Sequence, residues 1–167
     1  MVSTENTLDA LYRTHAPSVF RRARRLLGSD AEAQEVVQDV FLSLFERPEQ
    51  YAGKSKLTTF LYSAGTHACL NRIRDAKNRL RLLRERAAGD PEAKSDVGLT
   101  PEKLSLLHRM LERMPEELAR AAVYYYVDDL SHDEVARLLG CSRRQVGNLL
   151  KRVEEWGRAQ ELQHASQ

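Results

Sequence analysis

Residues 130–152 read LSHDEVARLLGCSRRQVGNLLKR, a stretch in which two helix starts follow each other closely. Ser131 stands three residues before Glu134, and Ser142 stands three residues before Gln145. In such a capping box the serine hydroxyl accepts a hydrogen bond from the third amide of the helix, while the Glu or Gln side chain bonds the serine amide. Gly140 lies between the two boxes and suits the left-handed turn that closes a helix. The stretch therefore predicts two helices joined by a tight turn.

The apolar and the cationic residues of this stretch fall on different sides of the two expected helices. The side chains predicted to pack between the helices are Val135, Ala136, Leu138, Leu139, Val146, Leu149 and Leu150. The outer side of the second helix carries cations and no anion, and comprises Arg143, Arg144, Asn148, Lys151 and Arg152. This pattern is typical of a DNA-binding helix-turn-helix, and an ordinary helical hairpin within a core is the alternative. Gly147 is discordant, because glycine inside a helix costs about 1 kcal/mol relative to alanine. Close approach to another backbone would justify it.

The composition fits a globular protein without a catalytic centre. Of the 167 residues, 30% are charged and 42% are hydrophobic. The sequence shows no apolar run approaching the ~20 residues of a membrane span and no signal-peptide core, so we expect a cytoplasmic protein that does not insert into membranes. Cys69 and Cys141 are isolated, and we expect both to be buried, reduced thiols. The histidines are scattered and catalytic motifs are missing, so we expect no enzyme, metal or cofactor.

Cations gather in two places, although the net charge is only +2. Residues 72–86 carry Arg72, Arg74, Lys77, Arg79, Arg81, Arg84 and Arg86 against Asp75 and Glu85. The second place is the helix at 143–152. A solvated helix face is the alternative for such a run, but two basic patches together indicate a polyanion contacted at two points.

Helical periodicity extends over most of the remaining chain. Apolar residues recur every three or four positions from 8 to 27, and Gly28 ends that helix. A second helix starts at Ser29 and stops before Pro48. Its cap is expected to be a third capping box with Glu32, and its outward positions are Glu32, Glu35, Gln38 and Asp39. A polar loop at 49–57 leads to a long helix that runs from Thr58 to near Arg86.

Residues 87–100 lose this periodicity and indicate a linker, after which Pro101 and Pro115 begin further helices. Tyr124, Tyr125 and Tyr126 are expected in the core. The predicted fold class is all-α, with two small helical bundles joined by a flexible linker, the C-terminal one a helix-turn-helix. The expected domains are residues 1–87 and 101–160, with the linker at 88–100 and a tail at 161–167.

Three segments of this chain resemble the bacterial sigma-70 family of RNA polymerase sigma factors, in its extracytoplasmic-function group. They are DAEAQEVVQDVF at 30–41, KLTTFLY at 56–62 and DLSHDEVA at 129–136. The first is similar to region 2.2, the second to the region that opens the promoter −10 element, and the third to region 4.2. Their order and spacing also match the family, so the likeness covers nearly the whole chain.

This resemblance implies a sigma factor that binds core RNA polymerase and directs promoter-specific initiation by recognising −10 and −35 elements. The implied contacts with the clamp helices of the beta-prime subunit are Gln34, Glu35, Gln38 and Asp39. The implied −10 contacts are Lys54, Lys56, Thr58, Phe60, Thr66, His67, Asn71, Arg72 and Arg74. The implied −35 contacts are Ser142, Arg143, Arg144, Gln145, Asn148, Lys151 and Arg152. The implied partners are core RNA polymerase, including its beta subunit, promoter DNA and an anti-sigma factor.

The chain departs from the family pattern at several of these positions. Phe60, His67 and Asn71 stand where the family usually has Trp, Asn and Asp, which leaves the −10 sequence preference open. Residues 144–147 read RQVG in place of the common GTVK pattern. The acidic linker is expected either to mimic nucleic acid within the polymerase or to act as a simple tether. His67 has the alternative of a hydrogen-bonded interfacial histidine.

Three other functions remain open at this point. The first is an autonomous helix-turn-helix regulator, which would bind paired DNA half-sites without polymerase. The second is a sigma-like adapter that binds polymerase without recognising promoters. The third, an enzyme acting on nucleic acid, ranks far below these, because Asp75 and Glu85 are too far apart along one helix to share a site.

Overall fold

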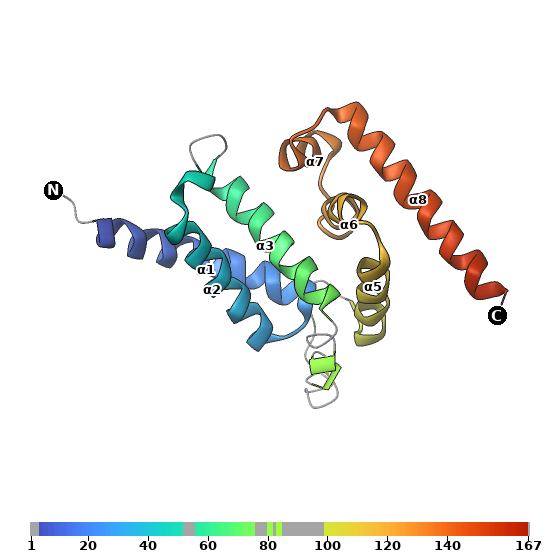
Figure 1. The fold of residues 1–167 in the computed structure, drawn as a ribbon, viewed down its shortest axis with the longest axis horizontal. Helices are drawn as coiled ribbons and strands as arrows, with labels where there is room; N and C mark the ends of the chain where they lie inside the picture. The colour runs from blue at the N-terminus through green and yellow to red at the C-terminus, as the bar shows by residue number, and fades with distance from the viewer. Residues whose placement is uncertain (1–3, 52–55, 76–79, 82, 85–98, 167) are drawn as a thin grey trace. The chain divides into compact units, whose positions relative to one another are not determined.

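The computed structural model of the chain describes residues 4–51, 56–75, 80, 81, 83, 84 and 99–166 (Figure 1). The described residues form helices and turns and contain no strand, which confirms the predicted all-α class. The chain divides into two compact units, Met1–Arg109 (unit 1) and Met110–Gln167 (unit 2). The predicted linker lies outside the described residues except for Leu99 and Thr100.

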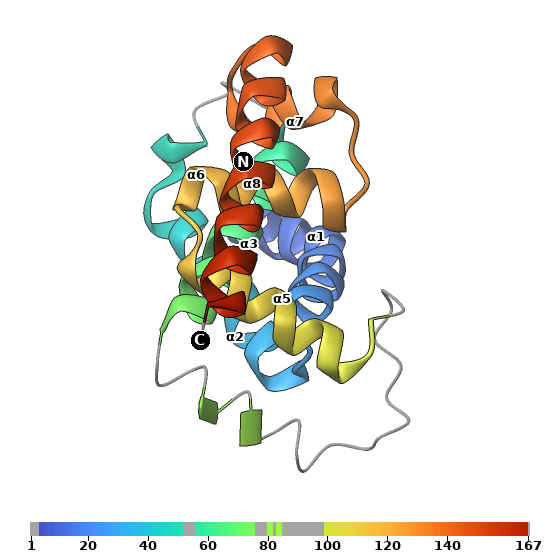
Figure 2. The same ribbon diagram turned by 90° about the vertical axis from the view of Figure 1, so that its right-hand side faces the viewer.

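Unit 1 is built on three helices that pack against one another, α1 (Thr4–Leu27), α2 (Asp30–Glu46) and α3 (Leu57–Arg74). Figure 1 and Figure 2 show these helices side by side from two directions. A short 3-10 helix, η1 (Pro48–Gln50), follows α2. The apolar stripes predicted from periodicity form the core, whose most buried members include Ala23, Leu26, Leu27, Val36, Val37, Phe41, Leu70 and Ile73. Gly28 has a φ of 72° and separates α1 from α2, as expected.

The predicted long helix from Thr58 to near Arg86 is wrong as one continuous helix, because α3 ends at Arg74, although residues 80, 81, 83 and 84 are again helical. Asp75 has an extended backbone with a ψ of 118°, and its amide donates hydrogen bonds to the carbonyls of Asn71 and Arg72. Ile73 is the last buried apolar residue of α3. Lys77, Arg79 and Arg86 of the basic run lie outside the described residues.

Helix α5 (Pro101–Arg113) contains the boundary between the two units, after Arg109, whereas the sequence placed the start of the second domain at 101. Leu104 and His108 are buried on this helix. The Nε2 atom of His108 lies 2.6 Å from the carbonyl oxygen of Leu26, at the end of α1. Because the last carbonyls of a helix have no partner within it, this contact satisfies one of them and ties the first half of α5 to unit 1.

Unit 2 contains the predicted helix-turn-helix. It comprises α6 (Glu116–Ala122), the π-helix η2 (Val123–Val127), α7 (His132–Leu139) and α8 (Arg143–Ala165). Both predicted capping boxes are present, and Gly140 has a φ of 65°, so the turn is confirmed. The buried side chains between the helices include Leu118, Val135, Ala136, Val146, Leu149 and Leu150, while Leu138 and Leu139 are only half-buried. Helix α8 continues into the predicted tail at 161–167 as far as Ala165.

The three successive tyrosines do not all belong to the core, which corrects the sequence expectation. Tyr124 is fully buried, Tyr125 is half-buried, and Tyr126 is 52% exposed. Consecutive side chains of a helix point in different directions around its axis, so the three tyrosines of η2 do not all face the same core. Cys141 is also half-buried rather than buried, whereas Cys69 is buried as expected.

Gly147 is not required by packing within unit 2. A Cβ atom built at Gly147 meets no atom within 4 Å, and the same holds for Gly157 further along α8. We expect Gly147→Ala and Gly157→Ala each to raise the free energy of unfolding by about 1 kcal/mol, because alanine has the higher helix propensity. Chemical denaturation of the two variants measures this. A destabilised Gly147→Ala beside a stabilised Gly157→Ala would contradict the open environment of Gly147.

Candidate functional site

One face of α2 carries the four residues expected to contact polymerase. Gln34 and Gln38 are exposed. The side chains of Glu35 and Asp39 are 43% and 60% exposed. Their three- and four-residue spacing places them on one side of the helix. The structure therefore brings all four predicted residues together on an accessible surface, which we call the acidic face.

Arg72 of α3 binds the carboxylates of this face. Its Nη1 atom lies 3.0 Å from Glu32 and 2.7 Å from Glu35, and its Nη2 atom lies 2.5 Å from Asp39. The Arg72 side chain is only 14% exposed. Arg72, which was predicted to bind −10 DNA, therefore donates hydrogen bonds to Glu35 and Asp39, which were predicted to bind polymerase, and to Glu32. Sequence reasoning did not find this connection, because the two helices are brought together only by the fold.

Glu32 was expected to point outward, and this was wrong. Its side chain is fully buried, and its carboxylate contacts both Arg72 and Arg81. The serine half of the third capping box is as predicted, with Ser29 Oγ accepting a hydrogen bond from the Glu32 amide at 3.3 Å. The burial could have been read from periodicity, because Glu32 lies four and eight residues before the core residues Val36 and Val40.

The ion pairs shift the pKa values of their members. Burial by itself would lower the pKa of the Arg72 guanidinium, but its hydrogen bonds to Asp39, Glu32 and Glu35 outweigh burial and raise that pKa. For Glu35, slight burial acts to raise the pKa, and the hydrogen bonds from Arg72 and Arg81 outweigh it and lower the pKa below 4.5. Both groups are therefore held in their charged forms.

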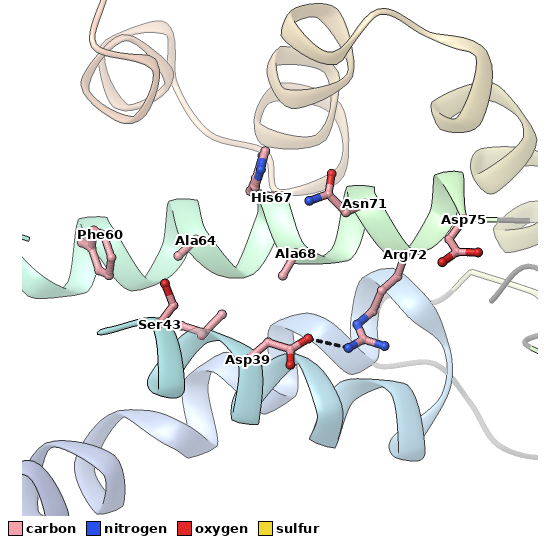
Figure 3. A pocket seen from close by; sticks show the side chains of 10 residues that line it. Asp39, Ser43, Phe60, Ala64, His67, Ala68, Asn71, Arg72 and Asp75 are labelled. Atoms are coloured by element: carbon pink, nitrogen blue, oxygen red, sulfur yellow. Dashed lines mark hydrogen bonds and ion pairs between the residues drawn. The ribbon is translucent and has the colours of Figure 1, made fainter. Parts of the chain in front are cut away.

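A pocket of about 450 Å³ lies between α2 and α3. It is lined by Asp39, Val40, Ser43, Phe60, Ala64, His67, Ala68, Asn71, Arg72 and Asp75. Figure 3 shows Arg72 reaching from α3 toward α2, where its guanidinium meets Asp39. Phe60, His67, Asn71 and Arg72 were predicted as −10 contacts, so the structure gathers four predicted residues in one cavity. Ser43, Ala64, Ala68 and Asp75 were missed, because small or acidic side chains give no DNA-binding pattern in a sequence.

Thr66 must be removed from the predicted DNA contacts, because it is fully buried. Its hydroxyl accepts hydrogen bonds from Arg22 Nε at 3.1 Å and Nη2 at 2.6 Å, and donates one to the Tyr62 carbonyl at 2.9 Å. The Arg22 guanidinium also lies 3.7 Å from the centre of the Tyr62 ring. Thr66 therefore helps to hold α1 against α3.

The remaining predicted −10 residues lie near the two ends of α3. Lys56 and Thr58 are exposed at its start, and Arg74 is half-exposed at its end. Phe60 contacts Tyr51 edge to face, with ring centres 6.0 Å apart. Lys54 lies outside the described residues.

The predicted −35 residues all lie in the cap and first three turns of α8, and all are exposed: Ser142, Arg143, Arg144, Gln145, Asn148, Lys151 and Arg152. Ser142 and Gln145 also cap the helix, with Gln145 Oε1 accepting from the Ser142 amide at 2.8 Å. Arg143 lies 3.8 Å from Asp133, and Arg152 lies 3.5 Å from Glu117. Exposed pairs of this length contribute little free energy, so both arginines can turn to another partner.

A second pocket, of about 330 Å³, adjoins this surface and is lined in part by Gln145, Asn148 and Arg152. Its other lining residues include Glu117 and Arg120 of α6, which sequence reasoning had not included. Among the described residues, three or more His, Cys, Asp or Glu side chains nowhere gather as metal ligands would. No helix in the described part of the chain is long and apolar enough to cross a membrane.

Two family descriptions match the chain in succession. Sigma-70 region 2 matches residues 11–79, and Sigma-70, region 4 matches residues 104–155. The chain belongs to the sigma-70 family. The first match contains the acidic face and the pocket between α2 and α3, and the second contains the helix-turn-helix.

Several relatives of this chain are ECF RNA polymerase sigma factors. It is 25% identical to SigE of Mycolicibacterium smegmatis over 95% of the chain and 63% of SigE. It is 23% identical to SigW of Bacillus subtilis over 81% of the chain and 76% of SigW. The chain thus spans less than two thirds of the length of SigE.

A solved structure of CnrH, in complex with the cytosolic domain of CnrY, has the same fold as this chain. The two chains share 19% sequence identity with a TM-score of 0.52, over 99% of this chain and 92% of the other. At that identity the likeness shows the fold alone.

The depressed pKa of Glu35 predicts an acid-dependent loss of stability. A carboxylate whose pKa is lower in the folded state stabilises the fold above its unfolded pKa of 4.5, and this contribution disappears as the pH falls through the folded pKa. Between about pH 5 and about pH 3 the wild type should therefore lose more unfolding free energy than Glu35→Gln. Urea denaturation across this range measures it, with Glu49→Gln in exposed η1 as the control. Parallel profiles for wild type and Glu35→Gln would contradict the pairing.

Proposed function

We propose that this protein is a sigma factor that binds core RNA polymerase and directs initiation at promoters with −10 and −35 elements. The observation that carries the proposal is the succession of both sigma regions along one chain, each with an exposed polar surface of its own. An enzyme needs an arrangement of reacting groups, whereas these surfaces offer charge and shape for binding. We also assign the protein to the cytoplasm, where promoters and polymerase are found, and give it no catalytic role.

The acidic face of α2 would dock on the clamp helices of the beta-prime subunit. Gln34 and Gln38 offer amides for hydrogen bonds, and the partly exposed Glu35 and Asp39 offer negative charge. A partner surface with lysines or arginines complements such a face and is steered toward it at low salt. We also propose that the protein contacts the beta subunit of core RNA polymerase.

The pocket between α2 and α3 would receive a base of the −10 strand after the duplex opens. Its volume of about 450 Å³ admits a planar base, Phe60 offers a ring for stacking, and Asn71 offers amide groups for hydrogen bonding. Extruding a base costs a few kcal/mol, which such contacts offset. Lys56 and Arg74 near the ends of α3 would neutralise backbone phosphates.

The start of α8 would enter the major groove at the −35 element. Arg143 and Arg144 lie at the exposed N-terminal end of the helix, where recognition helices contact base edges. Asn148 follows one turn later, and Lys151 and Arg152 are placed for phosphates. An anti-sigma factor that covers these surfaces is the regulator expected for the family.

An autonomous regulator remains the second candidate, because the helix-turn-helix is complete within unit 2. A gel shift on promoter DNA with and without core polymerase separates the two functions. Tight binding to palindromic DNA by the isolated protein would favour the regulator, since dimeric regulators bind paired half-sites without help. Run-off transcription with purified core polymerase on genomic fragments tests the sigma factor directly and separates it from an adapter that binds polymerase without starting transcription.

We expect Arg143→Ala and Arg144→Ala to reduce promoter-specific transcription while polymerase binding stays unchanged. Each arginine contact with a base edge is worth about 1–3 kcal/mol, so a loss of roughly 5-fold to 150-fold is expected for each. Run-off transcription and co-elution with core polymerase measure the two properties. Asp39→Lys is the matched variant on the other surface and should weaken co-elution. Equal loss of polymerase binding in all three variants would contradict this division between the units.

We expect Asn71→Ala to slow promoter opening about fivefold, since a hydrogen bond to an unpaired base is worth about 1 kcal/mol. Fluorescence of 2-aminopurine placed in the −10 element reports opening in the polymerase complex. Binding to the −35 duplex should be unchanged, because Asn71 lies in unit 1. Normal opening kinetics in Asn71→Ala would remove the pocket from the proposed strand-binding site.

A further inference from the structure

Arg81 lies beyond the end of α3 and returns to the acidic face of α2. Its Nη2 atom contacts the buried carboxylate of Glu32 and lies 3.1 Å from Glu35 Oε2. The Arg81 side chain is 44% exposed, and that of Glu35 is 43% exposed. A cation of the chain itself therefore occupies part of the surface on which polymerase is proposed to dock.

Arg72 and Arg81 both contact Glu32 and Glu35, but their side chains differ in exposure to solvent. Arg72 is 14% exposed and contacts Glu32, Glu35 and Asp39 from a rigid position on α3. Arg81 contacts two of the three, Glu32 and Glu35, with a side chain that is 44% exposed. Glu32 therefore keeps a guanidinium partner through Arg72 when Arg81 leaves. The Arg81–Glu35 pair joins two partly exposed side chains and is therefore weak, whereas the Arg72–Glu32 pair is buried and costly to break, so Arg81 is the cation that a partner can displace from Glu35.

We propose that Arg81 is an intramolecular competitor of polymerase: it neutralises Glu35 in the free protein and must be displaced when a cationic partner surface docks on the acidic face. This inference rests on the proposed function. Arg81 then sets how tightly the free protein binds polymerase, and Arg72 remains in place to hold Glu32.

The competition predicts that removing the Arg81 charge tightens binding to core polymerase. An exposed pair of this kind shifts an equilibrium by about two- to fivefold, so the Kd of Arg81→Ala should fall by that factor. Arg81→Gln should act in the same direction and keeps an N–H donor for Glu32, while Arg81→Lys keeps the charge and should resemble the wild type. The difference between Arg81→Ala and wild type should shrink in high salt, which screens exposed charges.

Arg84→Ala is the matched control. Arg84 is an exposed arginine three residues further along the chain, so its removal changes the net charge by the same amount. Its Kd should stay at the wild-type value. Equal tightening by Arg84→Ala would show a general charge effect and overturn the proposal.

Fluorescence titration of labelled core polymerase with each full-length variant gives the Kd values, and thermal unfolding establishes that each variant is folded. An unchanged or higher Kd for folded Arg81→Ala and Arg81→Gln overturns the inference. Unfolding of both variants also overturns it, because Arg81 would then be a structural clamp. If wild type binds and the Arg81 variants match it, only the inference fails. If wild type does not bind polymerase at all, the proposed function fails with it.

Discussion

The buried carboxylate of Glu32 is the constraint on which unit 1 depends. An ion taken out of water without a partner costs several kcal/mol, so a fully buried glutamate requires a cation within contact distance. Arg72 meets this requirement at 3.0 Å, and its planar guanidinium has further donors that reach Glu35 and Asp39. These contacts hold α3 against α2. The acidic face and the pocket between the two helices are both consequences of that single arrangement.

The same ion pairs connect the acidic face with the pocket between α2 and α3, which the sequence analysis had assigned to different partners. Asp39 belongs to the acidic face and also lines the pocket, where it pairs with Arg72. A partner that binds the Asp39 carboxylate therefore competes with Arg72, which lines the pocket. Unit 2 differs, because its cations at Arg143 and Arg152 have only distant, exposed partners. Such side chains can change partners at little cost, which suits a surface that has to meet DNA.

Local interactions explain which parts of the fold were predictable. A capping box involves residues three positions apart, and a left-handed glycine acts on its own turn, so both helix starts in the helix-turn-helix and the turn at Gly140 follow from adjacent residues. The apolar stripes of α1 and α2 were likewise visible as periodicity. The end of α3 was not visible in this way, because the residues after Ile73 include good helix formers and no local pattern marks the extended backbone of Asp75.

The sequence by itself determined the all-α class, the helix-turn-helix and the gathering of exposed cations at the start of α8, because each depends on the spacing of residues within one helix or turn. Only the tertiary structure decided which polar side chains are buried and which partners they bind. Thr66 is inside and bonded to Arg22, and Arg72 is committed to three carboxylates from another helix. A side chain's charge is written in the sequence, but its partner is set by which helix packs against it, and this depends on contacts between residues 33 to 44 positions apart.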